Sequence, residues 1–171
     1  LRHSSAASDV YKRQQKYLLT TKKGMTIESV LMRKKNRATI CLSTQVGCAV
    51  DCSFCATAKM GFVKNLSVGE IIDQYFQLER LSDTKITNVV FMGMGEPLLN
   101  YKNSIAAAKL LNHEKGINLG ARRITISTAG IISKIKKFTK EKHPFRLAIS
   151  LNGSNHDQRL KIMPITKNQT F

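Results

Sequence analysis

The sequence lacks any long apolar run. No stretch of its 171 residues approaches the roughly 18–20 consecutive apolar residues that a membrane span requires. Its first residues also lack the apolar segment of a secretory signal. We therefore expect a cytoplasmic protein without a membrane partner.

Cysteine is scarce and confined to one short segment. All four cysteines lie between Cys41 and Cys55, whereas a disulfide framework would spread them along the chain. Such crowding, in a chain without a signal segment, indicates metal or redox chemistry in a reducing compartment.

Negative charge is scarce too. Only 11 Asp and Glu stand against 28 Lys and Arg, which gives a formal net charge of +17. A surplus of this size indicates a polyanionic partner, most often nucleic acid, and a basic solvated surface is the alternative. The apolar content of 42% is enough for one domain with a core.

Both ends of the chain look artificial. The stretch Asp9–Gln14 resembles the translated end of a transposon adapter used in sequencing libraries. We therefore predict that residues 1–14 are a non-native segment and leave them out of the fold. The chain stops at Phe171 without a closing element, so we expect an open reading frame that is truncated at both ends.

Short strands and helices of about a dozen residues alternate along the remaining chain. Residues 15–36 predict a β-hairpin that turns at Gly24. Strands are expected at 37–43, 87–92, 123–127 and 146–151, and helices after the capping box Ser67–Glu70 and at 103–115 and 131–141. This alternation predicts an α/β fold in which 37–171 form part of a (β/α) barrel, with a doubly wound open sheet as the alternative.

The cysteine spacing predicts a metal centre. Cys48, Cys52 and Cys55 follow the pattern CxxxCxxC, and three such thiolates can each hold one iron of a [4Fe–4S] cluster. The fourth iron would then be open to the amino and carboxylate groups of S-adenosylmethionine (SAM). A zinc site with Cys41 as fourth ligand is an alternative, although structural zinc prefers paired CxxC knuckles, and unliganded core thiols are another.

Glycine and polar residues follow the predicted strands. The segment Gly93–Pro97 comes directly after the strand at 87–92, where glycines let the backbone approach a ligand closely. In a barrel the next strand ends converge on the same side, so their hydroxyl and amide groups could bind ribose or carboxylate, with strand-end capping as the alternative. The candidates are Gly95, Glu96, Ser127, Ser150, Leu151 and Asn152.

Together these segments resemble one family, the radical SAM dual-specificity 23S rRNA and tRNA adenine-C2 methyltransferases of the RlmN type. The resemblance runs from about Thr26 to Phe171, and its most specific parts are Arg37–Cys48 and Asn88–Asn100. It implies a radical SAM barrel, a [4Fe–4S] cluster, SAM as cofactor, and 23S rRNA and tRNA as substrates. It also implies a reducing electron donor such as flavodoxin and a monomer at full length.

The resemblance also assigns roles to residues. The C2 atom of adenine is electron-poor, so it does not attack an electrophilic methyl group, whereas a carbon-centred radical adds to it. In the family the methyl group is carried on a C-terminal cysteine. Cys41 would then remove the C2 proton and resolve the protein–RNA adduct by forming a disulfide, so we expect a partly exposed, reactive thiol. Glu28 matches the proton-accepting glutamate, and the six strand-end candidates match SAM contacts.

Two departures from the family pattern matter. Asn152-Gly153 stands where the family usually has His-Ala, and no cysteine follows Cys55. The methyl-carrying cysteine would therefore lie outside this chain, and we expect these 171 residues to be inactive by themselves. The alternative functions are C8-specific methylation of the same adenosine by a Cfr-like enzyme, or a non-catalytic, zinc-stabilised RNA-binding module.

Overall fold

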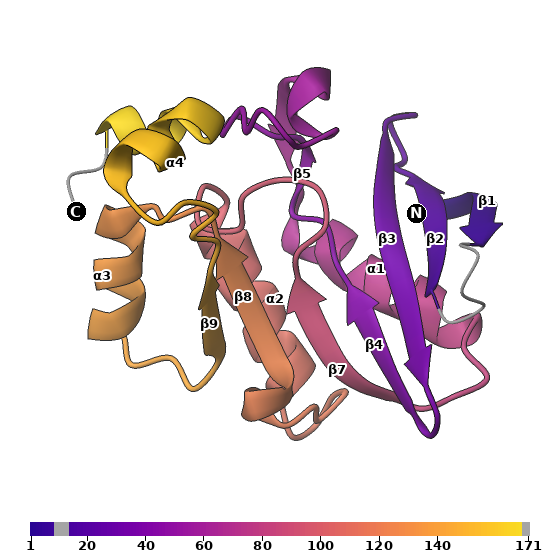
Figure 1. Cartoon of the computed structure of the whole chain (residues 1–171). Coiled ribbons are helices and arrows are strands. Elements are labelled where there is room, and N and C mark those ends of the chain that lie inside the picture. The colour runs from indigo at the N-terminus through magenta and orange to yellow at the C-terminus, as the bar shows by residue number, and fades with distance from the viewer. Residues whose placement is uncertain (9–13, 169–171) are drawn as a thin grey trace.

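The computed structural model describes residues 1–8 and 14–168 (Figure 1). The strands are β1 (Arg2–Ser8), β2 (Gln14–Thr20), β3 (Thr26–Lys34), β4 (Arg37–Cys41), β5 (Gln45–Gly47), β6 (Phe62–Asn65), β7 (Ile86–Phe91), β8 (Ile124–Thr128) and β9 (Arg146–Ile149). The helices are α1 (Val68–Arg80), α2 (Tyr101–Asn112), α3 (Ile132–Lys140) and α4 (His156–Ile162), with short 3-10 turns at Ala58–Met60, Ala121–Arg123 and Pro164–Asn168.

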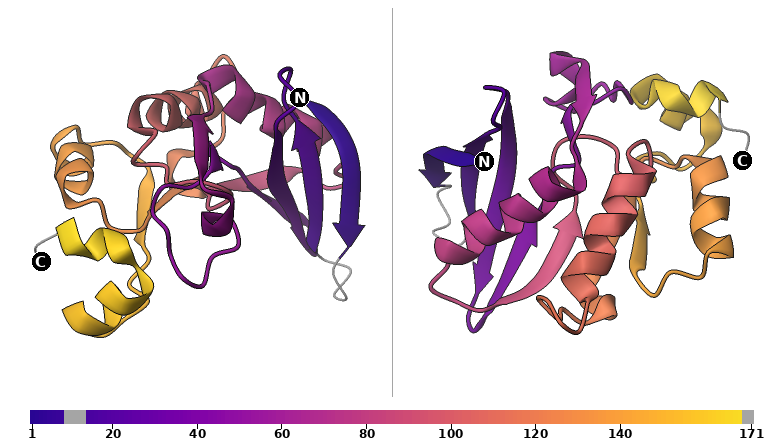
Figure 2. Two further views of the ribbon diagram at one scale, coloured as in Figure 1. Left: turned by 90° about the horizontal axis from the view of Figure 1, so that it is seen from above. Right: turned by 180° about the vertical axis from the view of Figure 1, so that it is seen from behind.

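The large sheet has the strand order β1-β2-β3-β4-β7-β8-β9. Strands β1 to β4 are antiparallel neighbours, and β4, β7, β8 and β9 run parallel. Each βα unit adds its strand on the same side of the previous one, whereas a doubly wound sheet reverses its order at a switch point. Helices α1 and α2 accordingly cover the same face (Figure 2). The predicted partial (β/α) barrel, preceded by a hairpin, is confirmed.

The core lies between this sheet and its helices. Alternate strand residues such as Ile40, Phe91 and Ile126 are fully buried, and each such side chain contributes roughly 1.5–3 kcal/mol relative to exposure. Helix α1 begins as predicted, because the Ser67 hydroxyl accepts from the Glu70 amide at 3.2 Å and the Glu70 carboxylate accepts from the Ser67 amide at 2.9 Å. The helix is thereby fixed at the end that lies next to the cysteine loop.

The opposite face of the sheet is open. Cys41 lies opposite Val30 on β3 and beside Val90 on β7, and Val90 lies beside Thr125 on β8. Because side chains alternate along strands, Glu28, Cys41 and Ser127 share this face. Figure 1 looks onto it, and among the described residues no helix lies in front of the strands.

Several elements differ from the sequence expectations. The segment 1–14 contains β1, which pairs with β2; Asp9–Arg13 of the adapter-like stretch lie outside the described residues, and its non-native origin stays a prediction. Helix α2 ends at Asn112 rather than near 115. On α1, the apolar Phe76 is exposed, whereas the polar Gln74 is buried in the core.

The helices of the described residues are too short or too polar to cross a membrane.

Candidate cluster and cofactor site

A cavity of about 300 Å³ lies at the C-terminal edge of the parallel strands. Its lining comes from the segment after β5 and from the C-terminal ends of β7, β8 and β9 with the residues that follow them, and Met163 after α4 completes it. The predicted site residues on its wall are Cys48, Cys52, Cys55, Gly95, Glu96, Ser127, Ser150 and Asn152. The fold therefore brings the cysteine loop and the strand ends together in one place.

The cysteine loop is closed by a small antiparallel sheet, β5 with β6. Gly47 has a φ of +73°, and a Cβ built on it would lie 1.7 Å from the Gly61 carbonyl oxygen, so only glycine fits. The Cys48 amide donates to that same oxygen at 2.9 Å, and the Cys55 amide donates to the Cys52 carbonyl at 3.0 Å. These contacts fix the backbone of the cysteine loop, whose three cysteines line the cavity.

The three cysteines fit a cluster better than a single ion. All four cysteines of the chain are free thiols, and Cys41 lies apart from the cavity. The zinc alternative needs Cys41 as its fourth ligand, and Cys41 is not among the residues that line the cavity. A [4Fe–4S] cluster instead takes one thiolate at each of three separate irons.

Burial changes the acidity of these thiols. It raises the pKa of Cys48, and it raises the pKa of Cys52 to about 11, where the nearby Cys48 and Cys55 thiols add to the effect. Without a ligand these two thiols stay protonated at neutral pH. A metal or cluster bound by these thiols would take them as thiolates, so binding at this loop would release protons.

The segment after β7 is shaped by close backbone approach. Gly95 has a φ of +93°, and a Cβ there would lie 2.4 Å from the Gln45 Cβ. The adjacent Glu96 is buried, and its carboxylate accepts from the Ala129 amide at 2.6 Å and the Leu98 amide at 2.9 Å. Burial raises the pKa of Glu96, and hydrogen bonds from Ala129, Leu98 and Thr128 oppose that rise. The Glu96 carboxylate therefore ties the ends of β7 and β8 together.

The end of β9 brings polar groups to the same cavity. Ser150 lines the cavity, and its amide donates to the Thr128 carbonyl at 2.9 Å. Asn152 lines it with a left-handed backbone, φ +52°, a conformation that asparagine adopts more readily than most residues. The Leu151 side chain, in contrast, is 65% exposed and lies outside the cavity wall.

Glu28 and Cys41 lie on the open face of the sheet rather than on the cavity wall. Glu28 is half-buried and forms an ion pair with Lys16 at 3.2 Å. Cys41 is only 7% exposed, so the expectation of a partly exposed thiol is wrong for this structure. Burial raises the pKa of Cys41 to about 11, against a smaller opposing effect of a hydrogen bond with the Met92 backbone.

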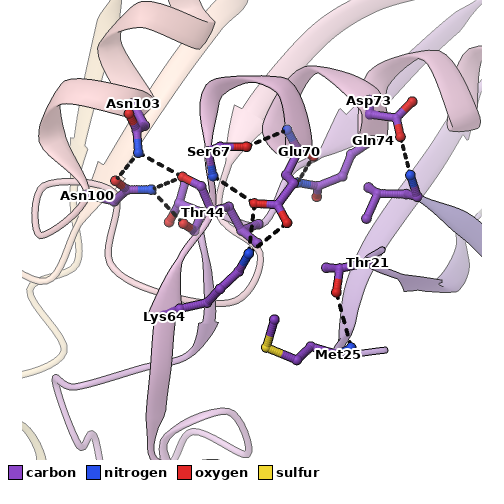
Figure 3. A network of polar contacts seen from close by, with 12 residues as sticks. Thr21, Met25, Thr44, Lys64, Ser67, Glu70, Asp73, Gln74, Asn100 and Asn103 are labelled. Carbon is purple, nitrogen blue, oxygen red and sulfur yellow. Dashed lines mark hydrogen bonds and ion pairs between the residues drawn. The ribbon is translucent and has the colours of Figure 1, made fainter. Parts of the chain in front are cut away.

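Buried amides around the cavity were not foreseen. The side-chain oxygen of Gln45 (Oε1) accepts from the Glu96 backbone amide at 2.8 Å. The side-chain nitrogen of Gln45 (Nε2) donates to the side-chain oxygen of Asn65, also at 2.8 Å. Asn100 donates to the Thr44 and Leu66 carbonyls, both at 2.8 Å, and Figure 3 shows this network beside Glu70 and Gln74. Their only sequence signal is a polar residue next to a motif, which does not distinguish a buried amide from an exposed one.

A CxxxCxxC loop above the C-terminal ends of (β/α)-barrel strands defines a radical SAM protein. The chain belongs to the radical SAM superfamily, whose family model matches residues 42–171. Members of this superfamily use a [4Fe–4S] cluster and SAM, and here Cys48, Cys52 and Cys55 are the residues available to hold the cluster.

The curated relatives of the chain include proteins named "Probable dual-specificity RNA methyltransferase RlmN". The protein from Aquifex aeolicus is 48% identical over 159 residues, which cover 91% of this chain and 46% of that protein. The protein from Pseudothermotoga lettingae is 49% identical over 152 residues, which cover 89% of this chain and 44% of that protein. The chain thus spans about half the length of the curated relatives it matches.

A solved structure shows the same fold. The crystal structure of a radical SAM methyltransferase from Sphaerobacter thermophilus matches with a TM-score of 0.91 and 39% identity. The match covers 98% of this chain and 50% of that chain.

Proposed function

We propose that the full-length protein is a radical SAM RNA methyltransferase that methylates C2 of an adenosine in 23S rRNA and in tRNA. The observation that carries this proposal is the single cavity on which the three-cysteine loop and the ends of β7, β8 and β9 converge. The similarity to RlmN proteins over about nine tenths of the chain supports the RNA substrate.

In this proposal Cys48, Cys52 and Cys55 would hold the cluster, and residues at the strand ends would bind SAM in the same cavity. The bound cluster and SAM supply the radical chemistry. The residues of the chain bind and orient the reactants: Gly95 allows close approach, and the hydroxyls of Ser127 and Ser150 provide polar contacts on the cavity wall.

The open face of the sheet would receive the target base. Glu28 and Cys41 share that face with Ser127, so both residues lie on the side of the sheet to which a base unstacked from the RNA would bind. In the proposed reaction Cys41 would take the C2 proton as a base. Its sulfur would then bond to the sulfur of the methyl-carrying cysteine, expected outside these 171 residues, as the bond from that sulfur to the transferred carbon breaks, and the electron pair and a proton would pass to that carbon to give the new methyl group. A reducing partner such as flavodoxin would supply electrons. The formal charge of +17 suits an RNA partner.

Anaerobic cluster reconstitution in the full-length protein tests the chemistry. After reduction in the presence of SAM, we expect 5′-deoxyadenosine and methionine, and Cys52→Ala should abolish both. Nucleoside analysis of methylated 23S rRNA and tRNA then identifies the product. We expect 2-methyladenosine, whereas 8-methyladenosine would identify the Cfr-like alternative, and bound zinc without iron or sulfide would refute the proposal.

A further inference from the structure

Arg159 on α4 is a buried cation at the end of two strands. The residue is only 5% exposed. Its Nη1 donates to the carbonyls of Ser150 and Leu151, each at 2.6 Å, and its Nη2 donates to the carbonyl of Ala129. One guanidinium therefore holds the chain after β8 and the chain after β9 in a fixed relation, which uses the planar fork of arginine.

Ala129 is held from its other side as well. Its amide donates to the Glu96 carboxylate at 2.6 Å, while its carbonyl accepts from Arg159. The buried Glu96 carboxylate and the buried Arg159 guanidinium therefore both hydrogen-bond to the backbone of Ala129. The chain of contacts from Glu96 through Ala129 and Arg159 to Ser150 runs across the ends of β7, β8 and β9.

The same helix contacts the cysteine loop. At the end of α4 the Ile162 carbonyl accepts from the Ser53 amide at 2.9 Å, and Ser53 lies between Cys52 and Cys55. Figures 1 and 2 show the cysteine loop reaching from β5 toward α4 above the strand ends. Helix α4 is therefore tied to the strand ends through Arg159 and to the cysteine loop through its last turn.

Two glycines make room for this arginine. A Cβ on Gly130, whose φ is +106°, would lie 2.9 Å from the Arg159 Nη2. A Cβ on Gly153 would lie 2.9 Å from the Arg159 amide nitrogen. The chain after β8 and the chain after β9 therefore approach the arginine closely enough for its hydrogen bonds to fix their positions.

We propose that Arg159 is the positioning residue that sets the spacing between the SAM-binding strand ends and the cluster loop. Arg159 is not itself a lining residue of the cavity, but it donates to the backbone carbonyls of Ala129 and Ser150, which line it. It acts through these two residues and through Leu151. This inference rests on the proposed function, because it assumes that SAM binds at the cluster in this cavity.

The test uses the full-length protein with its cluster reconstituted and compares wild type with Arg159→Lys and Arg159→Gln. Lysine keeps the charge but cannot serve three carbonyls in the same geometry. We expect iron and sulfide content to stay at the wild-type level in Arg159→Lys. The dissociation constant for SAM should rise about tenfold, as the loss of one charge-assisted hydrogen bond implies. The change that SAM produces in the electron paramagnetic resonance spectrum of the reduced cluster should be diminished.

Lys161→Gln is the matched control, because Lys161 is an exposed cation on the same helix, and it should bind SAM like wild type. If Arg159→Lys lowers only the melting temperature and keeps wild-type affinity and spectrum, Arg159 is merely structural and the inference is overturned. If Arg159→Gln does not assemble a cluster, the SAM affinity and the spectrum of Arg159→Lys alone support or overturn the inference. A wild-type cluster that shows no response to SAM would instead refute the proposed function itself, and this inference with it.

Discussion

At the residue scale, the shape of the cavity depends on residues that fix the backbone of the segment after β7. Gly95 combines a left-handed backbone, φ +93°, with a close approach to the side chain of Gln45. Gln45 in turn accepts from the Glu96 amide. The position of the segment after β7 thus depends on the absence of one Cβ and the presence of one buried amide.

Replacing Gly95 with alanine should therefore lower the free energy of unfolding more than an alanine substitution at a glycine with open space around it. Gly24 is the matched control, since its φ is +79° but nothing lies within 4 Å of a Cβ built on it. We expect Gly24→Ala to lower the free energy of unfolding of the full-length apoprotein by about 1 kcal/mol. Gly95→Ala should lower it by roughly 2–4 kcal/mol, because overpacking adds to the strain. Denaturant unfolding measures both, and equal losses would contradict the close-approach argument.

The buried thiol of Cys41 predicts a pH dependence of stability. Its pKa rises from 9.0 to about 11 on folding, so the unfolded chain loses the proton first. Its stabilising contribution is complete below about pH 9 and falls by about 2–3 kcal/mol as the pH rises to 11. Cys41→Ala removes this contribution. The difference in unfolding free energy between wild type and Cys41→Ala should therefore shrink from pH 8 to pH 11, and a constant difference would contradict the prediction.

Residue identities were easier to predict than residue environments. The CxxxCxxC spacing identified Cys48, Cys52 and Cys55 directly, and the structure places all three on one cavity. The exposure of Cys41 was predicted wrongly, because it depends on Val30 and Val90 in neighbouring strands. Arg159 gave no signal, since its partners are backbone carbonyls after β8 and β9.

At the element scale, long periodic segments were predictable and short ones were not. The capping box and the apolar spacing located α1, and the buried runs located β7, β8 and β9. Strands β5 and β6 are three and four residues long, too short to show alternation, and they pair across the whole cysteine loop. The buried Gln74 was missed for a related reason, since a polar residue on an apolar helix face contradicts the pattern that locates the face.

Gln74 joins α1 to β3 and to the segment between β4 and β5, which leads toward the cysteine loop. Its carbonyl oxygen accepts from the Ser29 hydroxyl at 2.6 Å and the Ser43 amide at 2.8 Å, and its amino group donates to the Ser43 carbonyl at 2.9 Å. Replacement by leucine leaves these buried groups without partners, so Gln74→Leu should cost about 2–4 kcal/mol of unfolding free energy. Gln77→Leu, on the same helix but half-buried and with one hydrogen bond to Leu1, should cost less than about 1 kcal/mol.

Denaturant unfolding of the full-length apoprotein compares the two glutamine variants. A Gln74→Leu protein as stable as wild type would show that the helix is held by apolar packing alone.

At the scale of the whole molecule, the strand order is that of a partial barrel, and one face of its sheet is not covered by helices among the described residues. Strands β4, β7, β8 and β9 advance in one direction, as in a barrel. The helices cover the outer face, while the inner face, which carries Glu28 and Cys41, is uncovered among the described residues (Figure 1). Periodicity could not separate a barrel from a doubly wound sheet, because both repeat the same βα unit. Only the side on which each strand joins its neighbour distinguishes them.

The outer edge of β9 predicts self-association of the 171-residue chain. Among the described residues β9 pairs only with β8, so one row of its backbone groups is available to another chain. Ile149 on this strand is 46% exposed. We expect the isolated chain to form oligomers in size-exclusion chromatography with light scattering, and Ile149→Lys to shift it toward monomer, because an edge lysine opposes strand pairing.

Leu110→Lys is the control: Leu110 is 50% exposed, but it lies on α2 away from this edge. If both lysine variants dissolve the oligomers equally, general solubility rather than the β9 edge explains the association.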